Sequence, residues 1–480
     1  MRNAMMKKRI MAVAASAVVS LSAMTSTLNG FIAPAVNGMT TALAAEASVK
    51  INAAVGYAEG MYATWGAVSG ASGYNVYVDG TQIDSELIRQ YSGYMRADAV
   101  GLKAGSHTIK VVPIIGGAPD TSKAAEAKAD VYAHDRSGFA FSNGKDLGAY
   151  NGDGTLKSGA VVVYVTNATK DSVSANIGGT TAKGFQNIIA AAKSSSAPVC
   201  IRVIGNITDP STLDKGDLLI DKTKCGITIQ GIGSDATLNG FGIRVKGSSD
   251  VEICNLGLMN CDSSEGDAVG LQQDNDHVWV HNNDFFYGDP GSDADQVKGD
   301  GALDTKKSHH ITHSYNHFFD NGKCNLQGNG DTTLNYITYH HNWYDHSDSR
   351  HPLVRVSSAV HCYNNYYDGV AKYGMIARLG SSVFAESNYF KDTNNPILIS
   401  QQGTDIADGD PIASDAGGMI KSYGNIYDNT EKPVTHADSA TDFDCFEASS
   451  ASEEVPSSYK TKKGGTSYSN FDTSSSMYSY

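Results

Sequence analysis

The chain has 480 residues, of which 41% are hydrophobic and 18% are charged, and its formal net charge at pH 7 is −14. This length predicts more than one domain or a single elongated one, and the composition is typical of a soluble globular protein. The acidic balance argues against nucleic acid as a partner, because such a partner requires a basic surface.

The first 44 residues have the pattern of a secretory signal peptide. A basic stretch, Lys7-Lys8-Arg9, precedes an apolar run from Ile10 to about Met24, and Ala42-Leu43-Ala44 provides small residues for cleavage. A membrane anchor is the alternative, but the apolar run is short for a membrane span and Pro34 interrupts the segment after it. We expect a secreted, extracellular protein that is not held in the membrane after cleavage.

Residues 45–132 alternate polar and apolar side chains over short segments that are separated by turns. Examples are Met61–Trp65, Tyr74–Val78 with Asp79-Gly80 after it, and His107–Val112. Period-two alternation with such turns predicts an antiparallel β-sandwich. The stretch from Trp65 to Val78 resembles fibronectin type III modules, which implies that Trp65 is a core residue and that the module is a spacer or accessory domain.

From residue 133 onward, strand-like segments recur almost without helices between them; residues 184–192 predict one short helix that caps an end of the fold. Many of these segments end in asparagine followed by apolar or aromatic residues, at intervals of 23 to 37 residues. A repeat in the low twenties with insertions predicts a parallel β-helix with one coil per repeat. The repeated residues are Asn255, Asn283, Asn316, Asn342, Asn365, Asn388 and Asn425.

We interpret this repeat as structural. Asparagine tolerates the left-handed backbone conformation at a corner, and its amide can bond to the asparagine of the next coil, about 4.8 Å away. The aromatic residue two positions later is then expected to point inward and to stack on its neighbours. On this interpretation neither the asparagines nor the aromatic residues bind substrate.

Four carboxylates lie on neighbouring predicted coils. Glu265 and Asp267 flank Gly266 and share a face of their strand, and Asp300 and Asp304 follow about one coil later. Carboxylates that converge from adjacent coils repel one another unless a cation lies between them, and oxygen ligands favour calcium. The alternative is a solvated acidic loop, because the region 284–304 is rich in aspartate.

Basic residues follow on the next predicted coils. The segments are Asp300–Lys306, then Lys323–Gly328, then Tyr339-His340-His341-Asn342-Trp343-Tyr344, and finally Ser349-Arg350-His351-Pro352-Leu353-Val354-Arg355. In this order and spacing they resemble the signature of the pectate lyase family. The resemblance covers roughly residues 160–446 and is densest from 265 to 390.

The resemblance implies a fold, a substrate and a reaction. The fold is all-β, a right-handed parallel β-helix over residues 133–480 after the N-terminal sandwich. The substrate is polygalacturonate, cleaved by β-elimination to unsaturated oligogalacturonides, with Ca²⁺ as the cofactor. The implied calcium ligands are Glu265, Asp267, Asp300 and Asp304, although the family commonly has aspartate in place of Glu265.

The resemblance also implies roles for the basic residues. Arg350 is the base, and Lys323, Arg355, Arg378 and Lys306 bind substrate. Arginine is protonated in water at ordinary pH, so this role requires neighbouring cations and exclusion of water, and we expect an alkaline optimum.

Three other functions remain open from the residues. They are a polygalacturonate hydrolase with an acid and a base, a calcium-independent pectin lyase, and a non-catalytic cell-wall-binding β-helix. We expect a monomer. The seven cysteines are assigned no bridge, and residues 447–480 form a Ser/Tyr-rich tail that stops short of the family's usual end.

The pairs His309-His310 and His340-His341 are the remaining candidates for chemistry. Adjacent residues of a strand point to opposite faces, so one histidine of each pair is expected inside and one outside. That arrangement is a poor metal site. We interpret both pairs as structural.

Overall fold

The computed structural model describes residues 46–286, 300–331, 333–356, 358–399 and 418–430. The predicted signal peptide and the predicted tail lie outside these residues, as does Cys445. The other six cysteines are all free thiols. Among the described residues, no helix is long and apolar enough to cross a membrane.

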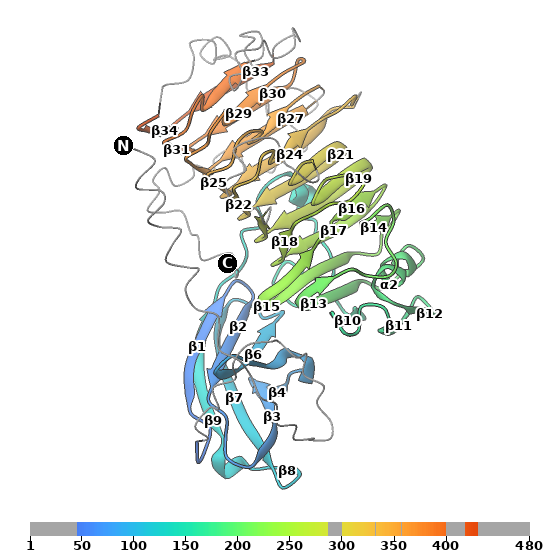
Figure 1. Ribbon diagram of the computed structural model, residues 1–480, viewed down its shortest axis with the longest axis vertical. Helices are drawn as coiled ribbons and strands as arrows, with labels where there is room; N and C mark the ends of the chain where they lie inside the picture. Colours follow the sequence, from blue (N-terminus) through green and yellow to red (C-terminus); the bar gives the residue numbers. More distant parts are fainter. Residues whose placement is uncertain (1–45, 287–299, 332, 357, 400–417, 431–480) are drawn as a thin grey trace, which may run out of the picture. The chain divides into compact units, whose positions relative to one another are not determined.

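The N-terminal region consists of two antiparallel sheets, as its alternating pattern predicts (Figure 1). Trp65 is fully buried between apolar side chains and contacts Tyr74 edge to face, with ring centroids 5.2 Å apart, so its prediction as a core residue is confirmed. The resemblance to fibronectin modules stays a prediction. The first sheet has the order β1 (Ile51–Tyr57), β2 (Gly60–Trp65), β6 (Tyr94–Val100), β5 (Ile88–Tyr91). The second has the order β4 (Thr81–Gln82), β3 (Ala71–Val78), β7 (Gly105–Ile115), β8 (Ala118–Pro119), with β9 (Ala125–Val131) paired to β7.

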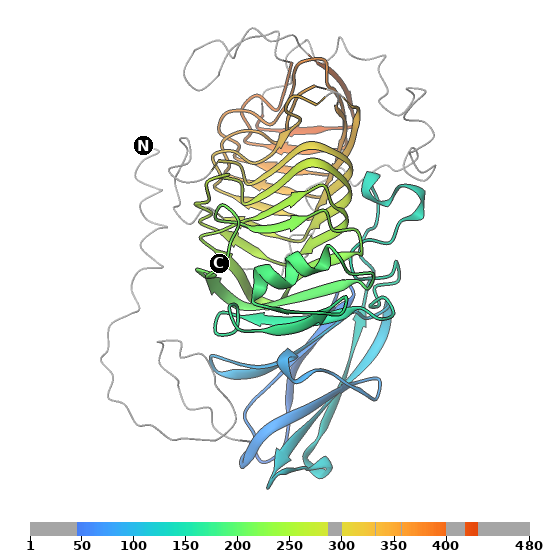
Figure 2. The same cartoon turned by 90° about the vertical axis from the view of Figure 1, so that its right-hand side faces the viewer.

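Short helical elements and one β-hairpin lie next to these sheets and at the start of the next region. The helix α2 (Phe185–Ala192) confirms the predicted capping helix: Phe185, Ile188 and Ile189 pack into the main core, and Figure 2 shows α2 at the first coils. The other elements are η1 (Ser85–Leu87), η2 (Thr121–Lys123), η3 (Phe139–Gly144), and the hairpin β11 (Ser174–Ile177) with β12 (Thr180–Lys183).

The rest of the described chain is one continuous parallel sheet that coils on itself, which confirms the predicted β-helix. Each coil contributes up to three strands, and each strand pairs with its equivalent in the next coil. We call the three stacks of strands row 1, row 2 and row 3, in the order in which one coil passes through them. Figure 1 shows them stacked from green to orange.

In each row, apolar side chains at alternate positions of a strand point into the core. Row 1 contains β14 (Leu218–Asp221), β16 (Ile243–Lys246), the first parts of β19 (Val269–His281) and β21 (Leu303–Ser314), then β23 (Leu326–Gln327), β26 (Leu353–Val354), β29 (Met375–Ala377) and β32 (Ile397–Ile399). Row 2 contains β10 (Val161–Thr166), the first parts of β13 (Val199–Thr208) and β15 (Ile227–Asn239), β17 (Ser249–Cys254), the ends of β19 and β21, then β24 (Asn335–His340), β27 (Ser358–Tyr363), β30 (Ser382–Glu386) and β33 (Met419–Tyr423). Row 3 contains the ends of β13 and β15, then β18 (Gly257–Met259), β20 (Asp284–Phe286), β22 (His317–Phe319), β25 (Trp343–Asp345), β28 (Tyr366–Asp368), β31 (Tyr389–Lys391) and β34 (Ile426–Asp428).

An asparagine ladder follows the corner between rows 2 and 3, as predicted. Each side-chain amide donates to the Oδ1 of the asparagine in the next coil, from Asn283 to Asn425, over 2.9–3.1 Å. Asn255 is outside the ladder, contrary to the prediction, because Leu256 occupies the equivalent position and donates its backbone N–H to Asn283.

The left-handed conformation belongs to the residue before each ladder asparagine, which corrects the sequence interpretation. These corner residues have φ values of 52–66°, whereas the ladder asparagines do not have positive φ. The ladder asparagine therefore sits at its position for its donor and acceptor, and the preceding residue makes the turn. The corner residues are Asn282, Tyr315, His341, Asn364, Ser387 and Gly424.

The aromatic residues two positions after the ladder asparagines stack inside row 3, as predicted. Consecutive ring centroids are 4.3–5.4 Å apart. The stacked residues are Phe285, Phe318, Tyr344, Tyr367, Phe390 and Tyr427.

Candidate active site

Three of the four predicted carboxylates meet where β19 and β21 begin in row 1. One oxygen atom of each of Asp267, Asp300 and Asp304 lies within 4.8 Å of those of the other two. Asp267 and Asp304 are buried, at 2% and 0% exposure, whereas Asp300 is half-buried. Backbone N–H groups hold the buried pair: Gly301 donates to Asp267 and Leu326 donates to Asp304, over 3.1 and 2.9 Å.

Burial makes this cluster electrostatically costly. Desolvation raises the pKa of Asp267 well above its ordinary value, and the charge of Asp304 raises it further. Desolvation likewise raises the pKa of Asp304. The folded protein therefore favours a proton or another cation at these carboxylates.

A lysine ammonium partly meets that need. Lys306 Nζ lies 3.2 Å from Asp267 Oδ2 and 3.5 Å from Asp304 Oδ2. Burial alone would lower the pKa of Lys306, but the two carboxylates outweigh burial and raise it. Asp304 Oδ2 nevertheless has no hydrogen-bond donor among the described residues.

The cluster fits a hard divalent cation. All three side chains offer oxygen, which calcium prefers, and one buried oxygen has no donor. Gly301 faces Asp304 so closely that a Cβ at this position would collide with the carboxylate, so only glycine leaves the carboxylate in place.

Glu265, the fourth predicted ligand, is engaged elsewhere. Its Oε1 lies 2.7 Å from Lys215 Nζ and 3.3 Å from Arg244, and Gln272 donates to its other oxygen. The hydrogen bond from Lys215 and the nearby charges lower the pKa of Glu265. Its role as a ligand stays a prediction.

The predicted basic residues follow along row 1, one coil after another. Lys323 Nζ lies 3.2 Å from Asp300 Oδ1, which joins the first cation to the acidic cluster. The strand register places Arg355 and Arg378 at equivalent positions of neighbouring coils, because Val354 pairs with Ala377. The same register places Lys306 two coils before Arg355, so the three cations form a column with a spacing of about 4.8 Å per coil.

Arg350 lies in the segment between β25 and β26, five residues before Arg355. Its backbone has φ = 65°, and its carbonyl accepts a hydrogen bond of 2.7 Å from Asn325 N–H. The Arg350 guanidinium is close enough to lower the pKa of Asp304, although burial of that carboxylate dominates. A cis peptide bond joins the next two residues, His351 and Pro352.

Two tyrosines of the interior stack hold this segment from within. Tyr344 Oη donates to Asn325 Oδ1 and Tyr367 Oη donates to the His351 carbonyl, each over 2.9 Å. The positions on both sides of this pair, Phe318 and Phe390, are phenylalanine. The sequence interpretation treated all aromatic residues of the stack alike and missed this role.

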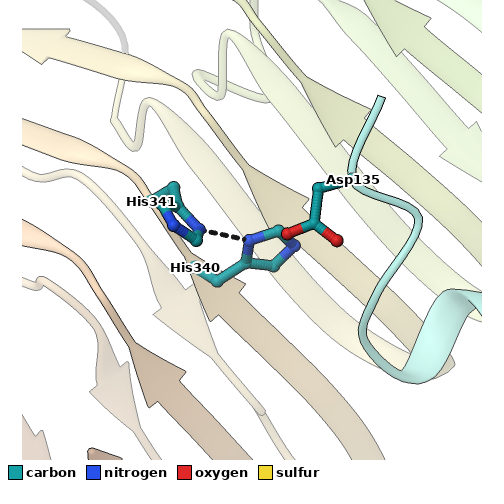
Figure 3. Close-up of side chains that lie close together, drawn as sticks. All are labelled: Asp135, His340 and His341. Carbon is teal, nitrogen blue, oxygen red and sulfur yellow. Dashed lines mark hydrogen bonds between the residues drawn. The ribbon is translucent and has the colours of Figure 1, made fainter. Parts of the chain in front are cut away.

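The pair His340-His341 does not alternate across a strand, which overturns the premise of the sequence interpretation. β24 ends at His340, and His341 is a corner residue with φ = 54°. The two rings therefore lie on the same side of the chain, with their Nδ1 atoms 2.9 Å apart (Figure 3).

Comparisons with known proteins agree with this geometry. The family model described as pectate lyase matches residues 108–439. A pectate trisaccharide-lyase of Bacillus licheniformis is 32% identical over 224 residues, which are 44% of this chain and 63% of that protein. Pectate lyase C of Dickeya chrysanthemi is 35% identical over 167 residues, or 33% of this chain and 43% of that protein. The match with this chain thus spans less than two thirds of the length of each of these relatives.

A solved structure resembles the fold over a longer stretch. The pectate lyase from Bacillus sp. N165, crystallised in complex with trigalacturonate, has a TM-score of 0.50 and 26% identity. The match covers 69% of this chain and 98% of that one.

Proposed function

The chain belongs to the pectate lyase family, and from this premise we propose that it is a secreted, calcium-dependent pectate lyase that cleaves polygalacturonate by β-elimination. The observation that carries the proposal is the order of charges along row 1. Three carboxylates converge at one end, and a column of cations continues from them coil by coil. A polymer with a carboxylate on every sugar matches such a surface.

Asp267, Asp300 and Asp304 would hold calcium, with Glu265 as a predicted fourth ligand after it leaves Lys215 and Arg244. When bound, calcium would supply positive charge that stabilises the charge developing next to the substrate acid group. Lys306 already lies among the same oxygens, so its ammonium must move aside and become available to substrate.

Arg350 acts as the base in this proposal. It takes the proton from C5 of a galacturonate unit, a double bond forms between C4 and C5, and the bond from C4 to the glycosidic oxygen breaks. The leaving oxygen takes up a proton from water, so the products are a new 4,5-unsaturated end and a released chain that ends in a hydroxyl. Arginine can accept a proton only where cations surround it and water is excluded, so an alkaline optimum follows.

The remaining cations bind and orient the polymer. Lys323, next to Asp300, and Arg355 neutralise the carboxylate of the reacting sugar, which favours the anionic intermediate. Arg378, one coil beyond Arg355, binds a neighbouring sugar. The trigalacturonate in the Bacillus sp. N165 structure supports this substrate class.

The test is the ultraviolet absorbance of unsaturated products from polygalacturonate at alkaline pH, with calcium and with a chelator. We expect a rise that the chelator abolishes and that Arg350→Ala lowers about 10²- to 10⁴-fold, the usual range for an acid–base group. Lys307→Ala, at an exposed lysine beside Lys306, is the control and should keep its activity.

Each other outcome overturns the proposal in its own way. New reducing ends without absorbance indicate a hydrolase. Absorbance that persists in the chelator indicates a calcium-independent lyase. A folded protein that is silent in both assays is a binding protein.

The proposal extends to the chain's organisation. Residues 1–44 direct secretion, and residues 45–132 form an accessory fibronectin-like domain ahead of the catalytic β-helix. Mass spectrometry of the protein secreted by an expression host checks the first part: a mature chain that begins close to Ala45 is expected, and retention of residues 1–44 contradicts it.

A further inference from the structure

The corner that carries His340 and His341 brings together two columns of side chains. His340 is the last residue of β24 in row 2, and it pairs with Ser314 and Tyr363 of the neighbouring coils. His341 is the corner residue between those of the adjacent coils, Tyr315 and Asn364. Figure 3 shows the carboxylate of Asp135, from the segment before η3, beside the His340 ring on the side away from His341.

Both imidazole rings are fixed by their neighbours. Tyr363 stacks on His340 with ring centroids 4.9 Å apart and an interplanar angle of 2°. Tyr315 stacks on His341 at 4.7 Å and 7°. His340 is fully buried and His341 is half-buried, so the pair is rigid yet reachable from solvent on the His341 side. Such pre-positioned ligands are what a binding site requires.

The protonation state of the two histidines follows from their contact with Asn364. Only 8% of Asn364 is exposed. Its Nδ2 lies 3.2 Å from His341 Nε2, and its Oδ1 has no hydrogen-bond donor among the described residues. The Nδ2 group donates to the lone pair of Nε2, so neutral His341 carries its proton on Nδ1, which faces His340 Nδ1 at 2.9 Å.

Asp135 lies beside the His340 ring on the side away from His341. Its negative charge stabilises a positive charge on the pair, either an added proton or a metal ion that displaces the proton between the two Nδ1 atoms.

We propose that His340 and His341, supported by Asp135, form a binding site for a first-row transition metal ion of the zinc type. One ligand atom of each residue lies within 4.8 Å of the others. Zinc binds imidazole nitrogen at about 2.0–2.1 Å in tetrahedral geometry, which separates two ligand nitrogens by about 3.3 Å. The observed 2.9 Å therefore needs an adjustment of a few tenths of an ångström.

This site differs chemically and spatially from the calcium cluster. Imidazole suits zinc, copper and nickel, whereas the all-oxygen set of Asp267, Asp300 and Asp304 suits calcium. The acidic cluster lies where β19 and β21 begin in row 1, whereas the histidines lie at the corner between rows 2 and 3. The inference does not depend on the proposed lyase activity.

The experiment measures zinc binding to the intact chain by titration calorimetry, with calcium in excess so that the acidic cluster is occupied. One high-affinity equivalent is expected, and Co²⁺ in its place should give the visible absorption of a low-symmetry site. His341→Gln, at the half-buried ligand, should lower the affinity at least about 100-fold. Asp135→Asn should lower it about 10- to 100-fold, as is usual for a carboxylate that supports histidine ligands. Lyase activity with calcium should not change in either variant.

The matched control is His310→Gln. His310 belongs to a second group, Asp276, His277 and His310, whose ligand atoms also lie within 4.8 Å of one another. Zinc binding that survives His341→Gln, or that disappears in His310→Gln instead, overturns the assignment. An absence of binding to the wild-type chain also overturns it and shows that the pair shares a proton. Circular dichroism confirms that each variant is folded, and the Co²⁺ spectrum of the wild type tests the site without any substitution.

Discussion

The asparagine corner and the acidic cluster beside row 1 belong to the same coils, but their buried polar groups find partners in opposite ways. Each ladder asparagine carries a donor and an acceptor, so identical residues in successive coils satisfy one another. The aspartates of row 1 carry only acceptors and like charges. Stacked in the same way, they leave Asp304 Oδ2 without a donor and raise the pKa of two carboxyl groups.

This contrast separates stability from function. The ladder is complete within the chain and needs nothing from solution, so it supports the fold. The carboxylate cluster lacks a partner for its negative charge within the chain, so the cluster favours the binding of a cation. Substitutions in the two regions should therefore have opposite effects on the stability of the calcium-free protein.

Asp304→Asn should have the largest effect on activity. The amide keeps an acceptor for Leu326 N–H but removes one charge from the cluster, so activity at saturating substrate should fall about 10³-fold. The same change should raise the melting temperature in chelator, because an ionised, desolvated carboxylate is gone. Product absorbance and calorimetry check the two effects; a drop in both activity and melting temperature would show that the carboxylate stabilises the fold.

Asn342→Ala should have the largest effect on stability. The Asn342 amide donates to the His313 carbonyl and to Asn365, and its Oδ1 accepts from Asn316, all at 3.0–3.1 Å. Alanine removes the acceptor of the Asn316 backbone N–H and the donor to the His313 carbonyl, whereas Asn365 Oδ1 keeps the backbone N–H of residue 342. Each buried group left unpaired costs about 1–3 kcal/mol. We expect a loss of about 3 kcal/mol or more in the free energy of unfolding.

Asn394→Ala is the matched control for that loss. Asn394 is exposed and donates one hydrogen bond to the Ala371 carbonyl, so its removal should cost less than about 0.5 kcal/mol. Denaturant or thermal unfolding of both variants makes the comparison. Equal losses would show that the ladder contributes no more than any other side-chain amide.

The sequence predicts the ladder because the ladder repeats. A regular spacing of asparagine with an inward aromatic residue two positions later can be recognised without coordinates, and it sets the coils in register. The details that failed are those that the repeat does not encode. Leu256 takes the ladder position that Asn255 was expected to fill, and the left-handed residue is the one before the asparagine.

The candidate site is predictable only in part, for the same reason. The aspartates and the arginines can be assigned to successive coils, so their convergence follows from the fold. The partners of Glu265 cannot be assigned, because Lys215 and Arg244 approach it from 50 and 21 residues away. Asp135 likewise reaches the histidine corner from a segment without a repeat.

Removal of calcium should change how stability depends on pH. The folded pKa values of Asp267 and Asp304 are raised, so their contribution is favourable below the ordinary carboxyl range of about 4 and is lost as pH rises through the raised values. In chelator, the melting temperature should therefore fall as pH rises above about 4. Calcium at 100 times its Kd should restore about 2.7 kcal/mol at alkaline pH.

Asp304→Asn is again the control for this pH dependence. It should flatten the fall in chelator and remove most of the shift that calcium causes. A melting temperature in chelator that is insensitive to pH between 4 and 8 would contradict the view that the cluster is strained without a cation.

The smallest effect on activity should come from the interior aromatic stack, whose tyrosines hold the segment that contains Arg350. Tyr367→Phe removes the hydrogen bond to the His351 carbonyl but keeps the stacked ring, so it should cost about 1 kcal/mol of stability and lower activity several-fold. Phe390→Leu, one coil further, disturbs the packing of the stack without a bond to that segment. It should cost more stability, about 1–2 kcal/mol, and leave the activity of the folded enzyme unchanged. Because the two variants are expected to rank in opposite orders for stability and activity, the same order in both measurements would mean that the tyrosine hydroxyls serve only the core.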